Sequence, residues 1–325
     1  MTKYENQIPT SMNMSLRAML SMLRDSLKGG QERRPWSHIP MVKSEFDEKL
    51  NAADHPQVTW FGHSAFLLEV EGTRLLFDPM LGNRPSPVSW AGTKRYNVNL
   101  PVQPEDFPPL DAIILSHDHY DHLDYSSIRR LMNKTDRFIV PVGVRRRLIQ
   151  MGVPSHKITE HGWWDELQFK GLTLACTPAR HFSGRGLFDR NSTLWCSWVI
   201  SGDETKVFFS GDSGYGPHFK EIGDKYGPFD LTMMECGQYD ERWASIHMMP
   251  EETVQAHLDV KGKLLIPIHW GAFTLAYHAW TDPVERITQA ASSANVDIAT
   301  PKIGEKVQIH TGVYPTEPWW RSSIR

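Results

Sequence analysis

The segment His117-Asp-His-Tyr-Asp-His-Leu-Asp124 contains three histidines and three aspartates within eight residues. It directly follows residues 111–116, an apolar and largely β-branched run that predicts a buried strand. Residues 125–132 come next and predict the beginning of a helix. We therefore expect this segment on a loop that leaves the end of a strand, where open α/β sheets usually carry their chemistry.

The residue types of this segment suggest metal binding. Neutral imidazole and carboxylate are the ligands that zinc and similar ions take from proteins. In an extended or turning loop, His117 and His119 can point the same way while Asp118 points elsewhere. Asp121 and His122 follow one turn later, close enough to hold a second ion. The spacing H-x-H-x-D-H therefore favours two adjacent ions. A single ion, or a polar surface loop without metal, are the alternatives that the residues leave open.

Three later segments repeat the arrangement of an apolar strand followed by a candidate ligand. His181 follows residues 172–176, Asp212 ends the run that begins at residue 207, and His269 follows residues 264–268. Because each candidate leaves the end of a predicted strand, the repetition is a physical argument for one shared metal site.

Together, these motifs resemble the signature of the metallo-β-lactamase superfamily of metal-dependent hydrolases. Further segments resemble, more narrowly, the branch that contains N-acyl-phosphatidylethanolamine-hydrolysing phospholipase D, which in bacteria also includes sugar-lactone-hydrolase-like proteins. These segments are residues 116–127, 163–164, 209–215, 227–231, 250–252 and 268–275. The similarity extends from about residue 57 to residue 310.

The resemblance implies a fold and a set of metal ligands. The fold would be α/β (α+β), a four-layer αββα sandwich in which two sheets face each other between helical layers; the strand and helix pattern alone indicates only α/β or α+β. Two divalent ions are implied, with zinc as the first expectation and manganese, iron or nickel also compatible. One ion would be held by His117, His119 and His181, the other by Asp121, His122 and His269, and Asp212 would bridge them.

The same resemblance implies the catalytic groups. A hydroxide shared by the two ions is the expected nucleophile, because metal coordination lowers the pKa of water to about 7. Asp121 could also orient that hydroxide. His247 matches a histidine that the phospholipase family keeps near the substrate, where it could hydrogen-bond the phosphate or assist the leaving group; the alternative is a loop histidine without a role. His63 either hydrogen-bonds a ligand or is structural, and Tyr277 and His278 are candidates for the pocket wall.

These features predict a phosphodiesterase of phospholipase D type that acts on N-acyl-phosphatidylethanolamine-like lipids. One alternative is a two-metal lactonase or esterase with a small soluble substrate, and another is a metal-binding scaffold without catalysis. A lipid substrate predicts an apolar channel and vesicle binding, whereas a lactone predicts a small closed pocket. The sequence does not separate these two substrates.

Composition restricts the partners and the location. The 325-residue chain has a formal net charge of −3, which argues against nucleic acid as the main partner, since a polyphosphate binder would show a basic excess. Its three cysteines are widely spaced and form no C-x-x-C motif, so neither a thiolate zinc site nor a disulfide framework is expected. No apolar run reaches transmembrane length, and the first residues lack a signal-peptide core. We expect a cytoplasmic protein, with peripheral membrane contact left open.

The chain is expected to divide into residues 1–56, an N-terminal helix and connector, and residues 57–325, the hydrolase domain. Within residues 15–28, five apolar residues are spaced as one face of a helix, which Gly29 and Gly30 would end. They are Leu16, Met19, Leu20, Leu23 and Leu27. We expect this helix to pack on the same chain or on a second subunit, with a membrane-surface helix as the alternative. Residues 79–109 are predicted to be either a loop over the site or an irregular structural excursion.

Overall fold

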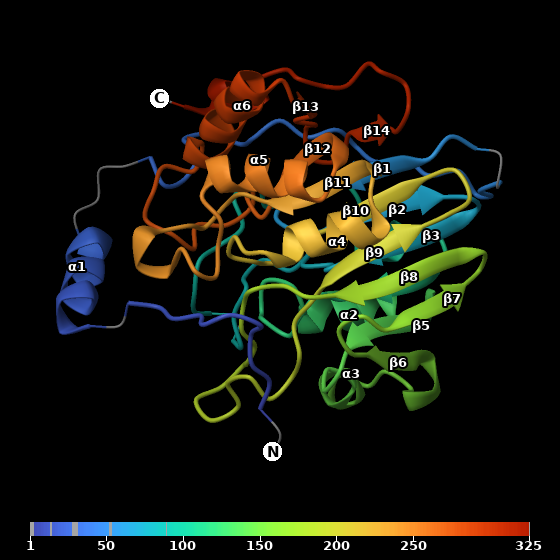
Figure 1. Cartoon of the computed structure of the whole chain (residues 1–325), viewed down its shortest axis with the longest axis horizontal. Helices are drawn as coiled ribbons and strands as arrows, with labels where there is room; N and C mark the ends of the chain where they lie inside the picture. The colour runs from blue at the N-terminus through green and yellow to red at the C-terminus, as the bar shows by residue number, and fades with distance from the viewer. Residues whose placement is uncertain (1–2, 14, 28–31, 52–53, 89, 325) are drawn as a thin grey trace.

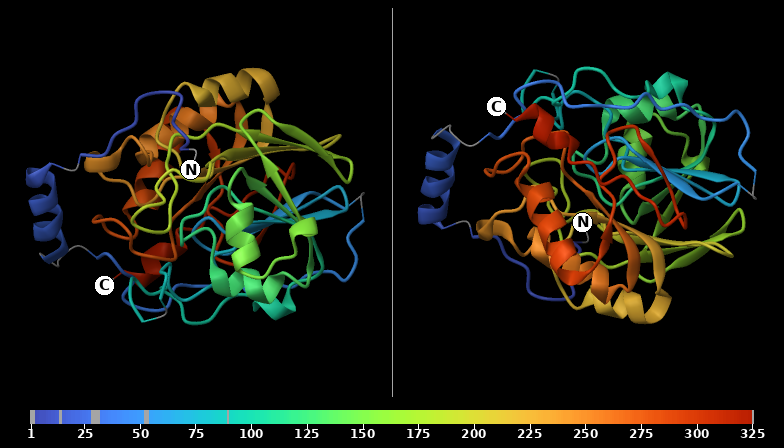
Figure 2. Two further views of the ribbon diagram at one scale, coloured as in Figure 1. Left: turned by 90° about the horizontal axis from the view of Figure 1, so that it is seen from below. Right: turned by 90° about the horizontal axis from the view of Figure 1, so that it is seen from above.

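The computed structural model describes residues 3–13, 15–27, 32–51, 54–88 and 90–324 (Figure 1). Two seven-stranded mixed sheets face each other, and helices cover their outer sides (Figure 2). This arrangement is the four-layer αββα sandwich that the resemblance implied, so the fold prediction is confirmed.

The first sheet has the strand order β14-β1-β2-β3-β4-β5-β6. Its strands are β1 (Gln57–Trp60), β2 (Phe66–Val70), β3 (Thr73–Phe77), β4 (Leu110–Ile114), β5 (Thr135–Pro141), β6 (Ile158–His161) and β14 (Lys306–Gln308). The turn between β2 and β3 has positive φ at both Glu71 and Gly72, the geometry that matches the twist of a two-residue hairpin. Strands β3 to β6 run parallel, and the helices α2 (Tyr125–Leu131) and α3 (Arg145–Gln150) connect β4 to β5 and β5 to β6.

The second sheet has the order β13-β12-β11-β10-β9-β8-β7. Its strands are β7 (Glu166–Phe169), β8 (Leu172–Thr177), β9 (Ser197–Ser201), β10 (Lys206–Phe209), β11 (Phe229–Glu235), β12 (Gly262–Ile268) and β13 (Asp297–Ile298). Strands β7 to β10 are antiparallel to their neighbours, and β10 to β13 are parallel. The parallel strands are connected by α4 (His218–Tyr226), α5 (Pro250–Asp259) and α6 (Asp282–Ala294). Four short 3₁₀ helices complete the described elements: η1 (Pro104–Asp106), η2 (Ser155–Lys157), η3 (Glu241–Trp243) and η4 (Trp319–Ser323).

The core lies between the two sheets and continues under the helices. The rings of Phe66 and Phe77 stack with centroids 4.4 Å apart, and Phe209 of the opposite sheet meets Phe66 edge-on at 5.2 Å. The alternate residues Leu67 and Leu76 belong instead to the cluster that packs under α2. Since successive strand residues point to opposite faces, strands β2 and β3 are buried along their whole length, which explains their continuous apolar runs. All three cysteines are free and buried in the hydrophobic core.

Helix α1 (Leu16–Leu27) stands away from this sandwich, at the left of Figure 1. Its five regularly spaced apolar residues are exposed, so the expectation that this face packs on the same chain is wrong. The predicted helix end at Gly29 and Gly30 lies outside the described residues. The division of the chain at residue 57 stays a prediction.

The long segment between β3 and β4 contains only η1 as a regular element among its described residues. Arg95 is buried and donates to the carbonyl oxygens of Met80 and Gly82 within the segment itself. Tyr96 N–H donates to Ala272 O at 2.9 Å. The bond to Ala272 holds the segment against the chain that follows His269.

Candidate metal centre

All seven predicted ligands lie on loops that follow the carboxyl ends of strands from both sheets. His117, His119, Asp121 and His122 follow β4, His181 follows β8, Asp212 follows β10, and His269 follows β12. Asp124 closes the first of these loops by accepting a hydrogen bond from Ser127 N–H at 2.8 Å, which caps α2. The loop therefore has a fixed beginning at the strand and a fixed end at the helix.

The first predicted trio converges on one point. His119 Nδ1 lies 2.9 Å from His117 Nε2 and 3.2 Å from His181 Nε2. A tetrahedral zinc ion with Zn–N bonds of about 2.0–2.1 Å would separate its nitrogen ligands by roughly 3.3 Å. The three nitrogens therefore fit one ion of this size.

The second predicted trio forms a neighbouring group. Ligand atoms of Asp121, His122 and His269 lie within 4.8 Å of one another, together with one from His63. His63 Nε2–H donates to Asp121 Oδ2 at 2.9 Å, so the role of His63 that the geometry supports is to hold a candidate ligand. This contact also fixes the direction of the Asp121 carboxylate.

Asp212 lies between the two groups. Its Oδ2 atom is 3.0 Å from His122 Nε2 and 3.8 Å from His117 Nε2. Its Oδ1 atom is 3.1 Å from His269 Nδ1. Neither Asp212 Oδ1 nor His122 Nε2 has a hydrogen-bond partner of suitable geometry among the described residues, although both are buried. An ion on each side of the carboxylate would satisfy these atoms, so the residues fit a pair of ions bridged by Asp212.

Burial keeps most of these imidazoles neutral, which is the form that binds metal. It lowers the pKa of His117, His181 and His269 well below the ordinary value. Burial also acts to raise the pKa of Asp212, but the neighbouring His122 and His269 hold it well below the usual range. The carboxylate is therefore ionised and able to bind metal.

Two residues that sequence reasoning missed orient histidines of the site. Asp78 directly follows β3, and its Oδ2 accepts a hydrogen bond from His122 Nδ1–H at 2.6 Å. This contact leaves His122 Nε2 for an ion. Glu235 is the last residue of β11 and accepts from His247 Nδ1–H at 3.0 Å. The signal available in the sequence was the same for both, a carboxylate at the end of an apolar strand.

His247 lies beside the ligand groups rather than on a remote loop. Its ring centroid is 5.0 Å from that of His181 and 5.1 Å from that of His269. Burial raises the pKa of Glu235 to about 7. Burial acts to lower the pKa of His247, yet the Glu235 carboxylate raises it to about 8. The imidazole is therefore positioned to exchange a proton near the centre.

The other residues of the sequence prediction lie outside the described groups that could hold a metal. Asp118 points away from the ligands, as expected, toward Arg147 Nε at 3.0 Å and Gly184 N–H at 2.8 Å. Tyr277 lies under the guanidinium of Arg242, and His278 stacks on Tyr239. These contacts do not show whether Tyr277 and His278 line the substrate pocket, so that expectation stays a prediction.

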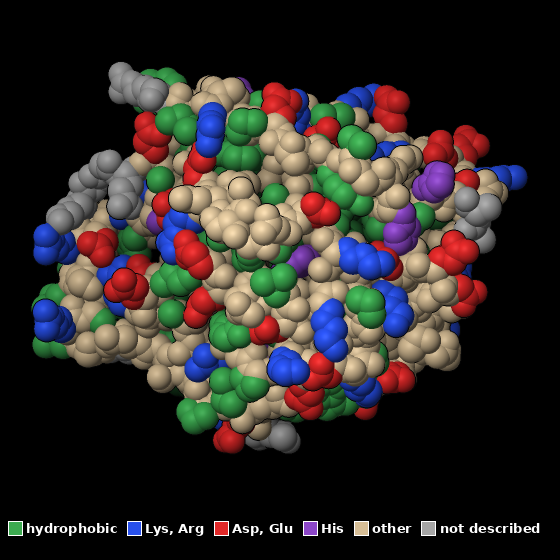
Figure 3. Space-filling model, turned by 45° about the horizontal axis from the view of Figure 1, so that its top comes forward, with side chains coloured by type: hydrophobic (Ala, Val, Ile, Leu, Met, Phe, Trp, Pro, Cys, Tyr) green, Lys and Arg blue, Asp and Glu red, His purple; other side chains and the backbone are tan. Residues whose placement is uncertain are grey.

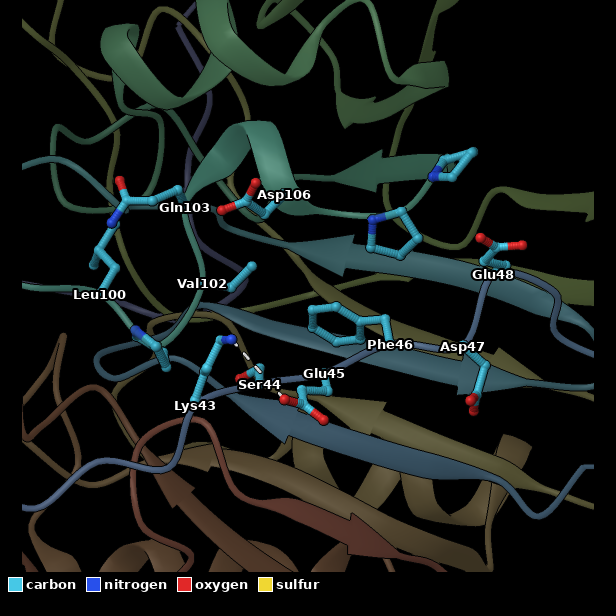
Figure 4. Close-up of a pocket in the computed structure, with 13 residues that line it drawn as sticks. Lys43, Ser44, Glu45, Phe46, Asp47, Glu48, Leu100, Val102, Gln103 and Asp106 are labelled. Atoms are coloured by element: carbon cyan, nitrogen blue, oxygen red, sulfur yellow. Dashed lines mark ion pairs between the residues drawn. The ribbon is translucent and has the colours of Figure 1, made fainter.

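A groove of about 860 Å³ lies on another part of the surface, between residues 43–48 and 100–109 (Figure 4). Phe46 forms part of its apolar wall, and Glu45, Asp47 and Asp106 are among its acidic lining residues. None of the candidate metal ligands lines this groove. Among the described residues, no helix is both long enough and apolar enough to span a bilayer.

Residues 73–270 match the family described as Beta-lactamase superfamily domain. An uncharacterized protein of Mycobacterium tuberculosis is 44% identical over 292 residues, which cover 89% of this chain and 77% of the relative. The N-acyl-phosphatidylethanolamine-hydrolyzing phospholipase D 1 of Caenorhabditis elegans is 38% identical over 229 residues, 67% of this chain and 64% of that protein. Igni18, a metallo hydrolase of Ignicoccus hospitalis, shares the fold with a TM-score of 0.58 at 22% identity, over 79% of this chain and 99% of that one. The chain therefore belongs to the β-lactamase superfamily of metal-dependent hydrolases.

Proposed function

We propose that this hydrolase is a phospholipase D-type phosphodiesterase that cleaves N-acyl-phosphatidylethanolamine-like lipids at a two-metal centre. The position of Asp212 between two ligand groups is the observation that carries the two-metal part of the proposal. The 38% identity to the phospholipase D of Caenorhabditis elegans supports the substrate class.

In this proposal the seven ligands divide as the family resemblance implies. One ion would be held by His117, His119 and His181, the other by Asp121, His122 and His269, and Asp212 would serve both. Bound there, two zinc ions or similar divalent ions would supply hydroxide at neutral pH and polarise the phosphoryl oxygen. Asp121, held by His63, is fixed in direction and can orient the attacking oxygen.

His247 is the proposed proton donor to the leaving group. Because Nδ1–H is donated to Glu235, Nε2 is the nitrogen that remains for the substrate. Hydrolysis adds water across the bond between phosphorus and the headgroup oxygen. The proton from His247 Nε2 neutralises the departing N-acylethanolamine oxygen, and phosphatidic acid is the other product.

The test is release of phosphatidic acid from vesicles that contain N-acyl-phosphatidylethanolamine. Metal-loaded wild type is compared with Asp212→Ala and His119→Ala, and with Asp136→Ala, which removes an exposed aspartate of β5. We expect release by wild type and Asp136→Ala, and its loss in the two ligand variants, whose circular dichroism spectra should match the wild type.

Two results would contradict the proposal. Wild-type turnover by either ligand variant after metal depletion would exclude the two-metal mechanism. No release by metal-loaded wild type would exclude this lipid, and cleavage of lactones or small soluble esters by the same protein would then identify the alternative hydrolase. A protein that binds metal tightly yet hydrolyses no ester in a broad panel would be a metal-binding scaffold.

A further inference from the structure

Helix α1 contacts the body of the protein through its polar face. Ala18 is its one buried residue, and Ser21 and Asp25 lie on the same side of the helix. Arg242 of η3 reaches both, with Nη1 donating to Ser21 Oγ and to Asp25 Oδ2 at 2.9 Å each. The guanidinium is itself held by Asp240, which accepts from Arg242 Nε at 2.6 Å. A clamp of polar contacts therefore fixes the orientation of α1.

The apolar face of α1 consequently points away from the protein. Leu16, Met19, Leu20, Leu23 and Leu27 are between 50% and 77% exposed. An amphipathic helix of a globular protein normally turns this stripe toward the core. Figure 2 shows from two further sides that α1 stands clear of both sheets and of the other helices. An exposed apolar stripe of this kind marks an interaction surface.

The charges beside the stripe indicate what binds it. Arg17 and Arg24 are exposed, and neither pairs with another described residue. Asp25 is the one carboxylate of the helix, and the clamp occupies it. Lysine or arginine side chains lie at the left edge of the molecule, where α1 stands, with acidic side chains beside them (Figure 3). On the helix itself, the charges beside the stripe are therefore those of Arg17 and Arg24.

A second copy of the chain fits this pattern less well than an anionic surface does. Leu16, Leu20, Leu23 and Leu27 have coiled-coil spacing, but they cover fewer than the three or four heptads that this structure needs. In a pair of such helices, Arg17 and Arg24 would occupy flanking positions without a carboxylate across from them. Anionic lipid headgroups supply that missing charge, and the acyl region accepts the leucines.

We propose that α1 is an interfacial anchor, which lies in the surface of an anionic bilayer with its leucines embedded and its two arginines at the lipid phosphates. The clamp connects this anchor to the candidate centre. Trp243, next to Arg242, accepts a hydrogen bond from Ile246 N–H at 3.0 Å, and Ile246 O accepts from His181 Nδ1–H at 3.0 Å. The anchor would present the centre to membrane lipids, so its biological role rests on the proposed function. Binding of α1 to vesicles does not depend on that function.

The test is co-sedimentation of the full, metal-depleted chain with vesicles of phosphatidylglycerol mixed with phosphatidylcholine, and with phosphatidylcholine alone. We expect wild type to prefer the anionic vesicles and to be released by salt. The double variant Leu20→Glu/Leu23→Glu should bind at least about tenfold more weakly. Arg17→Glu/Arg24→Glu should lose the preference for anionic lipid. The control Leu258→Glu places the same charge at an exposed leucine of α5 and should bind as wild type does.

The outcomes distinguish a lipid bilayer from a second copy of the chain as the partner of α1. Equal binding by wild type and Leu20→Glu/Leu23→Glu, or no binding of wild type to anionic vesicles, overturns the proposal. A wild-type dimer that the same double variant converts to a monomer, without vesicle binding, identifies a second copy as the occupant and also overturns it. Vesicle binding without phosphatidic acid release supports the anchor while the proposed phosphodiesterase fails. Circular dichroism spectra of all α1 variants should match that of wild type, which checks that they fold.

Discussion

Glu235 Oε2 lies 3.0 Å from His247 Nδ1, and this contact decides which imidazole nitrogen faces the candidate ligands. A carboxylate only accepts hydrogen bonds, so His247 donates Nδ1–H and keeps Nε2 for the site. The second carboxylate oxygen of Glu235 accepts from the backbone N–H groups of Ser213 and Met248, each at 3.1 Å. Glu235 is thus held by the backbone and in turn holds the imidazole.

The substitution Glu235→Gln should therefore impair turnover without removing metal. The amide can present its N–H₂ to His247 and favour the opposite tautomer, so we expect kcat to fall about tenfold to a hundredfold. KM and the bound metal per chain should stay near the wild-type values. Nitrogen NMR of the labelled His247 ring above pH 8, where the imidazole is neutral, reports the tautomer directly, and the spectrum should change in this variant. The exposed Glu204→Gln is the matched control. An unchanged tautomer with a reduced kcat would assign Glu235 a structural role only.

Asp78→Asn should weaken metal binding. The Asp78 carboxylate accepts from His122 Nδ1–H at 2.6 Å and also from Ser116 N–H at 2.8 Å. An amide in its place makes a weaker contact with the imidazole. Such changes typically lower the metal affinity about tenfold to a hundredfold. Competition with a chelator measures this affinity. Asp136→Asn serves as the control. Equal metal affinities in the two variants would mean that Asp78 does not support metal binding through His122.

The positions that the sequence predicted well are those with a local signal. Candidate ligands such as Asp212 and His269 end continuous apolar runs, and a run of that kind predicts a strand buried on both faces. The loop that carries His117 also borders a helix with an aspartate cap, so its limits were readable. Strands β13 and β14 were missed because two or three residues carry no periodicity.

Pairings between distant segments had no such signal. Glu235 and Asp78 end apolar strands as Asp212 does, but their partners His247 and His122 are identified only when the sheets are assembled. Helix α1 shows the same limitation in another form. Its periodicity predicts an apolar face and a polar face. The contact with Arg242 determines that the polar face packs on the rest of the protein.

Acid should destabilise the metal-free protein partly through His257. Burial lowers the pKa of this histidine to about 4 in the folded chain, against about 6.5 when it is unfolded. Above pH 6.5 neither state binds the proton, so stability is unaffected. Between pH 6.5 and 4 the unfolded chain binds a proton that the folded chain does not, and the free energy of unfolding falls by about 3 kcal/mol. Below pH 4 this loss is complete.

The substitution His257→Gln separates this contribution from the other acid-sensitive groups. Glutamine can keep a hydrogen bond to Thr232 Oγ1, which lies 2.7 Å from His257 Nδ1. Urea denaturation at pH 7.5 and at pH 4.5 should show a smaller loss of stability in the variant than in wild type. Equal losses in the two proteins would mean that His257 takes up its proton in the folded state.

Gly237→Ala should damage the metal centre through the backbone of His269. A Cβ at Gly237 would overlap the carbonyl oxygen of His269 and lie 2.8 Å from its carbonyl carbon. His269 cannot yield easily, because its φ is already +68° and its N–H is donated to His63 O at 2.8 Å. We expect a loss of about 2 kcal/mol in unfolding free energy and fewer metal ions bound per chain. Gly162→Ala is the control, since its Cβ would meet nothing closer than Asp165 Oδ2 at 3.4 Å. If elemental analysis found the same metal content in both variants, the carbonyl of His269 would have room to move, and this close approach would not be what positions its imidazole.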